Sequence, residues 1–252
     1  MSAIAYLNKI QEILDEIKTR EMPKIKKAAQ IMASSIQKGG RVYMFGSGHS
    51  IIPVMDIFPR YGSFVGFFPL YDPRLMWHNV IGPGGARELL WLERQEGYAR
   101  VFLQSYPLEP RDCMLVFSHG GLNTAPIEVA LEARAKGLKV ICVSSLENQK
   151  TATRTHPSGR MLPDIADIAI DNCVPPEDTL VDVGRVEKVA AGSTAAAVSV
   201  AMSLVAEIGS ILAKKDKLPP TFVSPNVKGV EKDHLQKVYQ AFTKFYYSRP
   251  AE

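Results

Sequence analysis

Two short apolar runs, each followed by a loop of glycine and hydroxyl residues and then by a helical stretch, constrain the fold of this chain most. The first run, 41–45, leads into Gly46-Ser47-Gly48-His49-Ser50. The second run, 113–117, leads into Ser118-His119-Gly120-Gly121-Leu122-Asn123-Thr124. A glycine-rich turn between a strand and a helix lets backbone N–H groups converge on a bound anion, and the helix N-terminus adds partial positive charge. Two such loops in one sheet predict a pocket for an anionic, hydroxyl-rich ligand such as a sugar phosphate.

Apolar strands alternate with helices along the chain, which is the pattern of a parallel sheet covered on both faces. We predict strands at 41–45, 63–68, 113–117, 139–143 and 166–170. We predict helices at 4–17, 25–36, 86–102, 125–135, 185–213 and 233–246. We find no repeat and no linker that would separate two domains. We therefore expect one α/β domain over 1–252, with an N-terminal helical extension at 1–38, a sheet core at 39–213 and a C-terminal tail and helix at 214–252.

The composition is that of an ordinary globular protein, with 46% hydrophobic and 22% charged residues. A net charge of +4, with the basic residues spread out, gives no stripe for nucleic acid. Three cysteines without metal-site spacing indicate reduced thiols, and we expect a cytoplasmic protein. The charge-free segment 189–206 is rich in small residues, so we expect a buried helix there and no membrane span.

The glycine loops do not match the common nucleotide-binding motifs. The loop that begins at Gly46 lacks the third glycine of the dinucleotide fingerprint, and it lacks the Lys-Ser/Thr pair of a nucleotide-binding phosphate loop. No pair of His, Cys or carboxylate residues has metal-ligand spacing. We therefore expect neither NAD, ATP nor a metal ion.

Candidate acid–base residues lie beside both loops. His49 and His119 lie within them, and His78 precedes a further glycine-rich turn. Each imidazole is suited to proton transfer near neutral pH, and each is equally suited to brace its loop with a hydrogen bond. Glu93 and Glu96 are three residues apart on the predicted helix 86–102, so we expect them to share one helix face.

Taken together, these residues resemble the SIS (sugar isomerase) domain family, in particular its sugar isomerase domain-containing or phosphoheptose isomerase-like subgroup. The resemblance extends over nearly the whole chain. It includes Gly39-Gly40, 45–50, His78, Leu92-Glu93-Arg94, Glu96-Gly97-Tyr98, 126–128, 130–133, 137–141, Ala166-Asp167, Ile170-Asp171-Asn172, Ser193-Thr194, Pro220, Phe222-Val223-Ser224 and Asn226. It implies an SIS-type, flavodoxin-like three-layer fold with a five-stranded parallel sheet and flanking N- and C-terminal helices.

The resemblance also implies an aldose–ketose isomerase that acts on a phosphosugar or a similarly acidic sugar through an enediol, without a metal or redox cofactor. Glu93 would move the proton, and His78 or His49 would assist ring opening. Ser47, Ser50, Ser118 and Asn123 would bind the anionic group and hydroxyls. The rest of the two loops would complete the binding set, namely Gly46, Gly48, His119, Gly120, Gly121 and Thr124.

Two positions depart from the family pattern. Relatives commonly carry Ser-x-Ser-Gly in the second loop, whereas Gly120 here lacks that hydroxyl. Relatives also carry a Glu-Glu pair where this chain has Met55-Asp56. Two other functions stay open: a lyase or etherase for an amino-sugar phosphate, and a non-catalytic sugar-phosphate-binding regulatory module. Protomers of the family pair near their sites, so we expect a homodimer or homotetramer.

Overall fold

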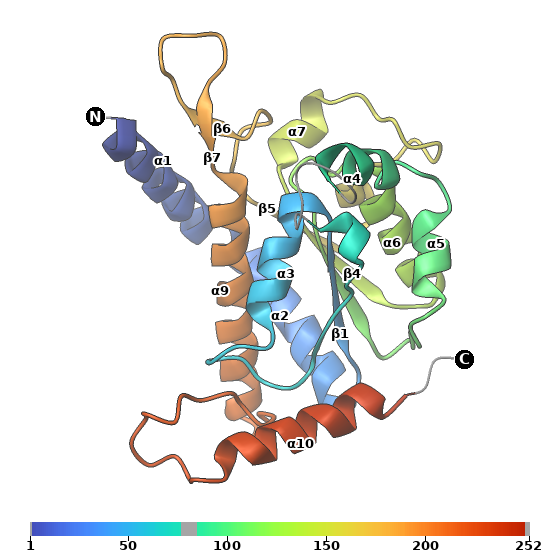
Figure 1. Ribbon diagram of the computed structural model, residues 1–252, viewed down its shortest axis with the longest axis vertical. Helices are drawn as coiled ribbons and strands as arrows, with labels where there is room; N and C mark the ends of the chain where they lie inside the picture. Colours follow the sequence, from blue (N-terminus) through green and yellow to red (C-terminus); the bar gives the residue numbers. More distant parts are fainter. Residues whose placement is uncertain (1, 77–84, 250–252) are drawn as a thin grey trace.

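A five-stranded parallel sheet forms the centre of the structure, a computed structural model that describes residues 2–76 and 85–249. The strands are β1 (Val42–Gly46), β2 (Phe67–Pro69), β3 (Cys113–Phe117), β4 (Lys139–Ser144) and β5 (Ile168–Asp171). They lie in the order β2-β1-β3-β4-β5, and every neighbouring pair is parallel (Figure 1). This is the strand order of flavodoxin-like folds. The predicted fold is confirmed.

Helices cover both faces of the sheet. One face carries α1 (Ser2–Glu16), the π-helical turn η1 (Ile17–Glu21), α2 (Met22–Gln37), α3 (Ile51–Ile57) and α9 (Ser193–Ala213). The other face carries α4 (Ala86–Leu92), α5 (Tyr98–Leu103), α6 (Thr124–Ala135) and α8 (Leu162–Ile165). The short helices η2 (Gly48–Ser50), η3 (Pro73–Leu75) and α7 (Leu146–Thr151) belong to the connections.

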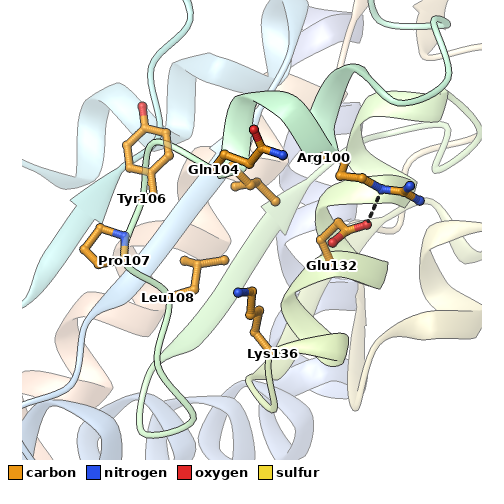
Figure 2. Close-up of a pocket in the computed structure, with 8 residues that line it drawn as sticks. Arg100, Gln104, Tyr106, Pro107, Leu108, Glu132 and Lys136 are labelled. Carbon is orange, nitrogen blue, oxygen red and sulfur yellow. Dashed lines mark hydrogen bonds and ion pairs between the residues drawn. The ribbon is translucent and has the colours of Figure 1, made fainter. Parts of the chain in front are cut away.

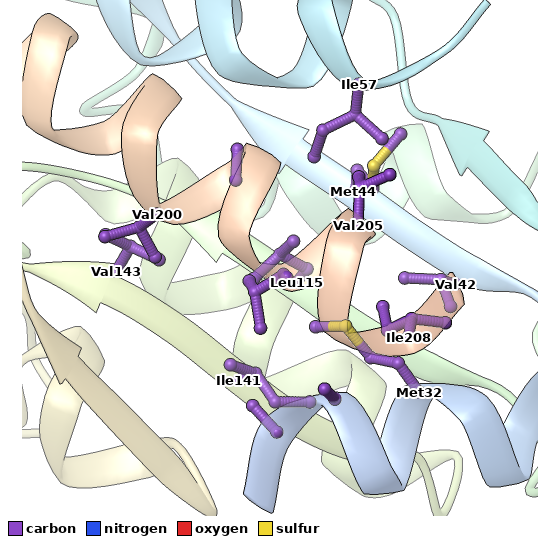
Figure 3. Packing of buried hydrophobic residues seen from close by; sticks show 14 of the residues in the cluster. Met32, Val42, Met44, Ile57, Leu115, Ile141, Val143, Val200, Val205 and Ile208 are labelled. Carbon is purple, nitrogen blue, oxygen red and sulfur yellow. The ribbon is translucent and has the colours of Figure 1, made fainter. Parts of the chain in front are cut away.

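Alternation along each strand divides the core into two clusters. In β1, Val42 and Met44 point to the α2 and α9 side, whereas Tyr43 and Phe45 point to the α6 side. All four side chains are at most 1% exposed. Figure 3 shows the first cluster, in which Met32 of α2 and Ile208 of α9 close over the sheet. Strands buried on both faces read as continuous apolar runs, which is why the sequence predicts them well.

The second predicted strand is shorter than expected. The sequence predicts 63–68, and the structure gives β2 over Phe67–Pro69. Gly66 before it has φ +142°, and Phe64 instead forms an isolated antiparallel bridge with Thr221. The prediction that 63–66 belongs to the strand is wrong, because the chain bends at this glycine.

The predicted helix 86–102 is in fact two helices. α4 ends at Leu92, and α5 begins only at Tyr98. Between them Gly97 has φ +80°, a left-handed conformation that glycine adopts without steric cost. The N–H of Gly97 donates to Glu128 of α6 at 2.7 Å. This turn holds 93–96 outside regular helix, so Glu93 is buried while Glu96 is exposed, and the prediction of a shared helix face is wrong.

The predicted helix 185–213 begins later than expected. Residues 179–191 form an antiparallel hairpin of β6 (Thr179–Val181) and β7 (Val189–Ala191), and α9 starts at Ser193. The carboxylate of Asp178 accepts the backbone N–H groups of Gly192 and Ser193 and the Ser193 hydroxyl, which fixes the start of the helix. A buried helix over 189–206 is therefore confirmed only from Ser193 onward.

Within the described ranges, α9 is the one helix long and apolar enough to cross a membrane. It packs against α2 and α3, and its buried side includes Val200, Leu204 and Ile208. This packing makes it a core helix of the sheet domain.

The C-terminal helix α10 (His234–Tyr247) is held through arginines. Arg41, only 1% exposed, places its guanidinium over the rings of Phe68 and Phe245 and donates to the Phe245 carbonyl oxygen at 2.8 Å. Arg249 beyond the helix donates to both oxygens of buried Asp112, at 3.0 and 2.8 Å. These contacts anchor the chain after α9 at the end of the sheet where β1 and β3 begin.

Candidate functional site

The two glycine loops meet at the one place where the strand order reverses. β1 and β3 are neighbours, and Gly46 pairs with Phe117 at their carboxyl ends. The connections from these strands leave toward opposite faces of the sheet, through α3 and α6. Open α/β sheets bind ligands in the crevice at such a switch point. We call the two loops, 46–50 and 118–124, together with Glu93 the candidate site.

The first loop requires glycine where β1 ends. A Cβ atom on Gly46 would lie 2.1 Å from the backbone oxygen of Ser50, so no larger residue fits. Gly48 has φ +58°, and the N–H of Ser50 donates to the Ser47 oxygen at 3.1 Å. The chain therefore folds back tightly after the strand, and α3 follows without a gap.

The second loop is closed by its own serine. The Ser118 hydroxyl accepts the N–H of Gly121 at 3.2 Å, and Gly121 has φ +63°. The carbonyl oxygen of Gly120 accepts the side-chain amide of Asn148 from α7 at 2.8 Å. Gly120 itself has an ordinary φ, and a Cβ there would meet only Asn148, at 3.7 Å. The backbone at Gly120 would therefore accept a serine.

Glu93 joins the two loops. Its Oε2 accepts the hydroxyl of Ser47 at 2.8 Å, and its Oε1 accepts the side-chain amide of Asn123 at 2.7 Å. Its backbone oxygen accepts the N–H of Ala125 at 2.8 Å, in the first turn of α6. Three residues from the predicted set, far apart in the sequence, thus form one hydrogen-bonded group.

The environment of the Glu93 carboxyl favours a bound proton. The residue is only 4% exposed, and this burial raises the pKa of Glu93 above its ordinary value. The hydrogen bond from Ser47 and the charge of Arg94 oppose that rise and lower the pKa in part. A carboxylate oxygen can accept more than one hydrogen bond, so both oxygens keep lone pairs for a proton. Such a group is suited to take up and return a proton.

His119 is held from both sides in this conformation. Asn172 Oδ1 accepts the N–H of Val174 at 3.0 Å, which directs the amide nitrogen of Asn172 toward His119 Nδ1 at 3.0 Å. Nδ1 is therefore the acceptor, and Nε2 carries the proton and donates to the Pro176 oxygen at 3.3 Å. With both nitrogens engaged, the ring braces the loop, one of the two roles that the sequence left open. Its binding role stays a prediction.

A narrow cleft of about 10 Å³ lies against the second loop. It is lined by residues of both loops, of α9 and of the segment after β5, including His49, Ser50, Ser118, His119, Asn172 and Thr194. Of the predicted binding residues, Thr124 is buried as the first residue of α6. His78, predicted for ring opening, lies outside the described residues. The structure thus places predicted residues in two groups on the same loops. Glu93 bonds to Ser47 and Asn123, whereas His49, Ser50, Ser118 and His119 line the cleft, which Glu93 does not line.

Three polar residues near the cleft were missed by the sequence reasoning. Asn172 follows β5 and orients His119, whereas Ser193 and Thr194 begin α9. All three occur in motifs that carry the family resemblance, but nothing in their spacing assigns them a role. Their position beside the loops depends on the packing of β5 and α9.

The described part of the chain contains no cluster of residues that could bind a metal ion. There, no group of three or more His, Cys, Asp or Glu residues lies close enough to hold a metal ion. The Cys113 and Cys142 thiols are buried, Cys173 is half-buried, and all three are free. The expectation of a metal-independent reaction stays a prediction.

Comparison with known proteins gives consistent results for sequence and fold. A family model described as SIS domain matches residues 5–145. A UPF0309 protein of Thermoanaerobacter pseudethanolicus is 34% identical over 241 residues, covering 93% of this chain and 95% of its own length. A UPF0309 protein of Halalkalibacterium halodurans is 35% identical over 241 residues, covering 95% and 94%.

Solved structures share the fold at lower identity. A phosphoheptose isomerase from Francisella tularensis superposes with a TM-score of 0.54 at 16% identity, covering 82% of this chain and 95% of that chain. The phosphoheptose isomerase of Neisseria gonorrhoeae gives a TM-score of 0.53 at 13% identity, covering 82% and 97%. At such identities the likeness establishes the three-layer fold alone.

Proposed function

The chain belongs to the SIS domain family, and from this premise we propose that it is an aldose–ketose isomerase acting on a phosphosugar or a similarly acidic sugar. The names of two solved structures with this fold, both phosphoheptose isomerases, support this reaction class. The observation that carries the proposal is Glu93, a buried carboxylate with a raised pKa held between Ser47 and Asn123.

The chemistry requires a proton to move between two adjacent carbons of the open-chain sugar. In the proposed reaction Glu93 removes the proton from the carbon next to the carbonyl, an enediol forms, and Glu93 returns the proton to the neighbouring carbon. Hydrogen-bond donors near the carbonyl oxygen stabilise the negative charge that develops there. The donor proposed for this role is Asn123, whose amide has a second N–H besides the one that contacts Glu93. The carbonyl oxygen gains a proton and the adjacent hydroxyl loses one, so one carbon is reduced and its neighbour is oxidised within the same molecule, and no external oxidant or reductant is needed.

The remaining roles follow from position. We assign ring opening to His49, which lines the cleft, or to His78. Ser50 and Ser118, with the backbone of Gly46, Gly48, Gly120 and Gly121, would bind the anionic group. At the Met55-Asp56 departure, Asp56 of α3 forms an ion pair with Arg60, which lies beyond the end of the helix, and Met55 is 47% exposed. α3 thus supplies no second carboxylate in the proposed mechanism.

The protein is further proposed to act in the cytoplasm as a homodimer or homotetramer. Free thiols at Cys113, Cys142 and Cys173 support a reducing compartment. Exposed apolar residues on α1, Ile4 at 62% and Leu7 at 64%, support association.

The decisive experiment compares Glu93→Gln with the unchanged protein on a panel of phosphosugars and other acidic sugars. The amide keeps the shape of the side chain but cannot accept a proton, so turnover should fall by about 10²–10⁴. Ligand affinity should change far less, because the loss falls on the transition state. Solvent deuterium should enter the carbon next to the carbonyl only with the unchanged protein.

The other outcomes separate the alternatives. Full activity in Glu93→Gln would exclude this residue as the base. Elimination of a substituent from an amino-sugar phosphate, without ketose formation, would identify a lyase or etherase. Tight sugar-phosphate binding without deuterium exchange in the unchanged protein would identify a regulatory binding module.

A further inference from the structure

A second concave region lies between α5, α6 and the connection that follows α5. This α5–α6 cleft has a volume of about 450 Å³ and shares no lining residue with the candidate site (Figure 2). α6 begins at the candidate site, and the cleft uses its far end, at Glu132 and Lys136. With a rise of about 1.5 Å per residue, this helix separates the two regions by roughly 18 Å. A ligand bound in the α5–α6 cleft would therefore not contact the residues that line the candidate site.

The inner wall of the α5–α6 cleft is apolar and fixed in place. Leu103, Tyr106, Pro107 and Leu108 line it. Leu103 is 5% exposed, and the Tyr106 ring packs against Phe102 at a centroid distance of 5.1 Å. These contacts leave a wall with few rotamers to order when a ligand binds, which limits the entropic cost of binding.

The rim of the cleft carries a net positive charge. Figure 2 shows the Lys136 side chain extending into the cleft, and its ammonium has no ion-pair partner among residues 2–76 and 85–249. Arg100 Nε donates to Glu132 Oε1 at 3.0 Å, so the one carboxylate of the rim is already neutralised. Arg100, Glu132 and Lys136 together leave one positive charge, and Gln104 adds an amide.

The two helices that form the cleft are tied together. Glu128 of α6 accepts the N–H of Gly97 at 2.7 Å and the N–H of Ala99 at 3.3 Å, at the start of α5. The pair between Arg100 and Glu132 spans the same two helices one turn later. The cleft is thus preformed.

We propose that the α5–α6 cleft is a second binding site, for a small organic anion with a flat apolar body. The apolar wall takes the body, and Lys136 takes the acidic group. The site does not depend on the function proposed above.

The test uses 2-naphthalenesulfonate, which has a flat apolar body, one fixed charge and no hydroxyl. Titration calorimetry of the full chain should give a dissociation constant of about 1 mM or below. The neutral 2-naphthalenesulfonamide should bind about tenfold more weakly, because it cannot pair with Lys136. Lys136→Met should weaken binding of the anion about tenfold and leave binding of the sulfonamide unchanged.

Three further variants make the test specific. Lys26→Met removes an exposed lysine from α2 and should leave both affinities unchanged. Gln104→Trp should fill the cleft and abolish binding of both probes. Ser118→Ala alters the candidate site and should leave the probes unaffected. A dissociation constant above about 10 mM, equal affinities in Lys136→Met and Lys26→Met, or loss of binding in Ser118→Ala would each overturn the proposal.

Discussion

The hydroxyl of Ser47 donates to the carboxylate of Glu93 at 2.8 Å, across 46 positions of sequence. This bond links the turn after β1 to the turn between α4 and α5. It also lowers the pKa of Glu93 against the effect of burial, which raises it. Ser47 is therefore expected to set both the position and the proton affinity of the proposed base.

Ser47→Ala and Ser50→Ala should differ in one measurable respect. Each removes a hydroxyl from the first loop and should weaken binding of a phosphosugar by about 1–2 kcal/mol. Of these two serines, Ser47 is the one that bonds to Glu93, so only Ser47→Ala should raise the pKa of Glu93 further. A carbon-13 NMR titration of the Glu93 carboxyl measures this without substrate. Equal titration midpoints in the two variants would contradict the assigned role of Ser47.

Glu93→Gln should stabilise the fold near neutral pH. Because burial raises the pKa of Glu93, the folded state binds this proton more tightly than the unfolded state. That contribution to stability is fully present below the ordinary glutamate pKa, and it is lost as the pH rises through the raised value. Thermal unfolding at about pH 7 should therefore give a higher Tm for the variant, and the difference should shrink toward about pH 4.

Exposed Glu96 offers the matched control for this stability measurement. Glu96→Gln should leave Tm unchanged at both pH values, because an exposed carboxylate keeps its water. A lower Tm for Glu93→Gln at neutral pH would mean that the bonds from Ser47 and Asn123 outweigh the cost of burying the charge.

Gly120→Ser should restore the hydroxyl that relatives carry in the second loop. The backbone there has an ordinary φ, and the nearest heavy atom to a new Cβ lies 3.7 Å away. Binding of inorganic phosphate, followed by thermal shift, should strengthen by about 1–2 kcal/mol. Gly121→Ser is the control: with φ +63° and Pro163 only 3.2 Å from the Cβ, it should cost about 1–3 kcal/mol of stability.

Failure of that experiment has a clear meaning. If inorganic phosphate and phosphosugars shift the Tm of neither the unchanged protein nor Gly120→Ser, the two loops do not form a phosphate pocket.

The protein should associate in solution. α1 extends from the body of the molecule in Figure 1, and Ile4 and Leu7 are 62% and 64% exposed on it. Light scattering at micromolar concentration should give the mass of a dimer or tetramer. Ile4→Asp with Leu7→Asp should weaken this association, because charges would enter an apolar interface. Val227→Asp, at an apolar residue that is 51% exposed in the connection between α9 and α10, should not.

A monomer at micromolar concentration would remove the prediction of association. It would also require the candidate site to be complete within a single chain.

The sequence by itself determined the parts of the fold that depend on local chemistry. Buried strands such as 113–117 read as continuous apolar runs, because both of their faces are covered. The turn after β1 was predicted from the glycine and serine residues that follow the apolar run. The structure gives the reason for the glycines: a Cβ atom on Gly46 would clash with Ser50, and Gly48 has φ +58°. Loops of this kind can be recognised from their glycine and hydroxyl residues, so both loops of the candidate site were predicted from the sequence.

Only the tertiary structure decided how those parts meet. Gly97 divides the predicted helix 86–102 once Glu128 of α6 accepts its N–H, and this turn brings Glu93 between Ser47 and Asn123. The hairpin before α9 depends on Asp178 in the same way, through bonds to residues 14 and 15 positions later. Such partners lie far apart along the chain, and local residue preferences carry no information about which distant groups satisfy a donor or a carboxylate.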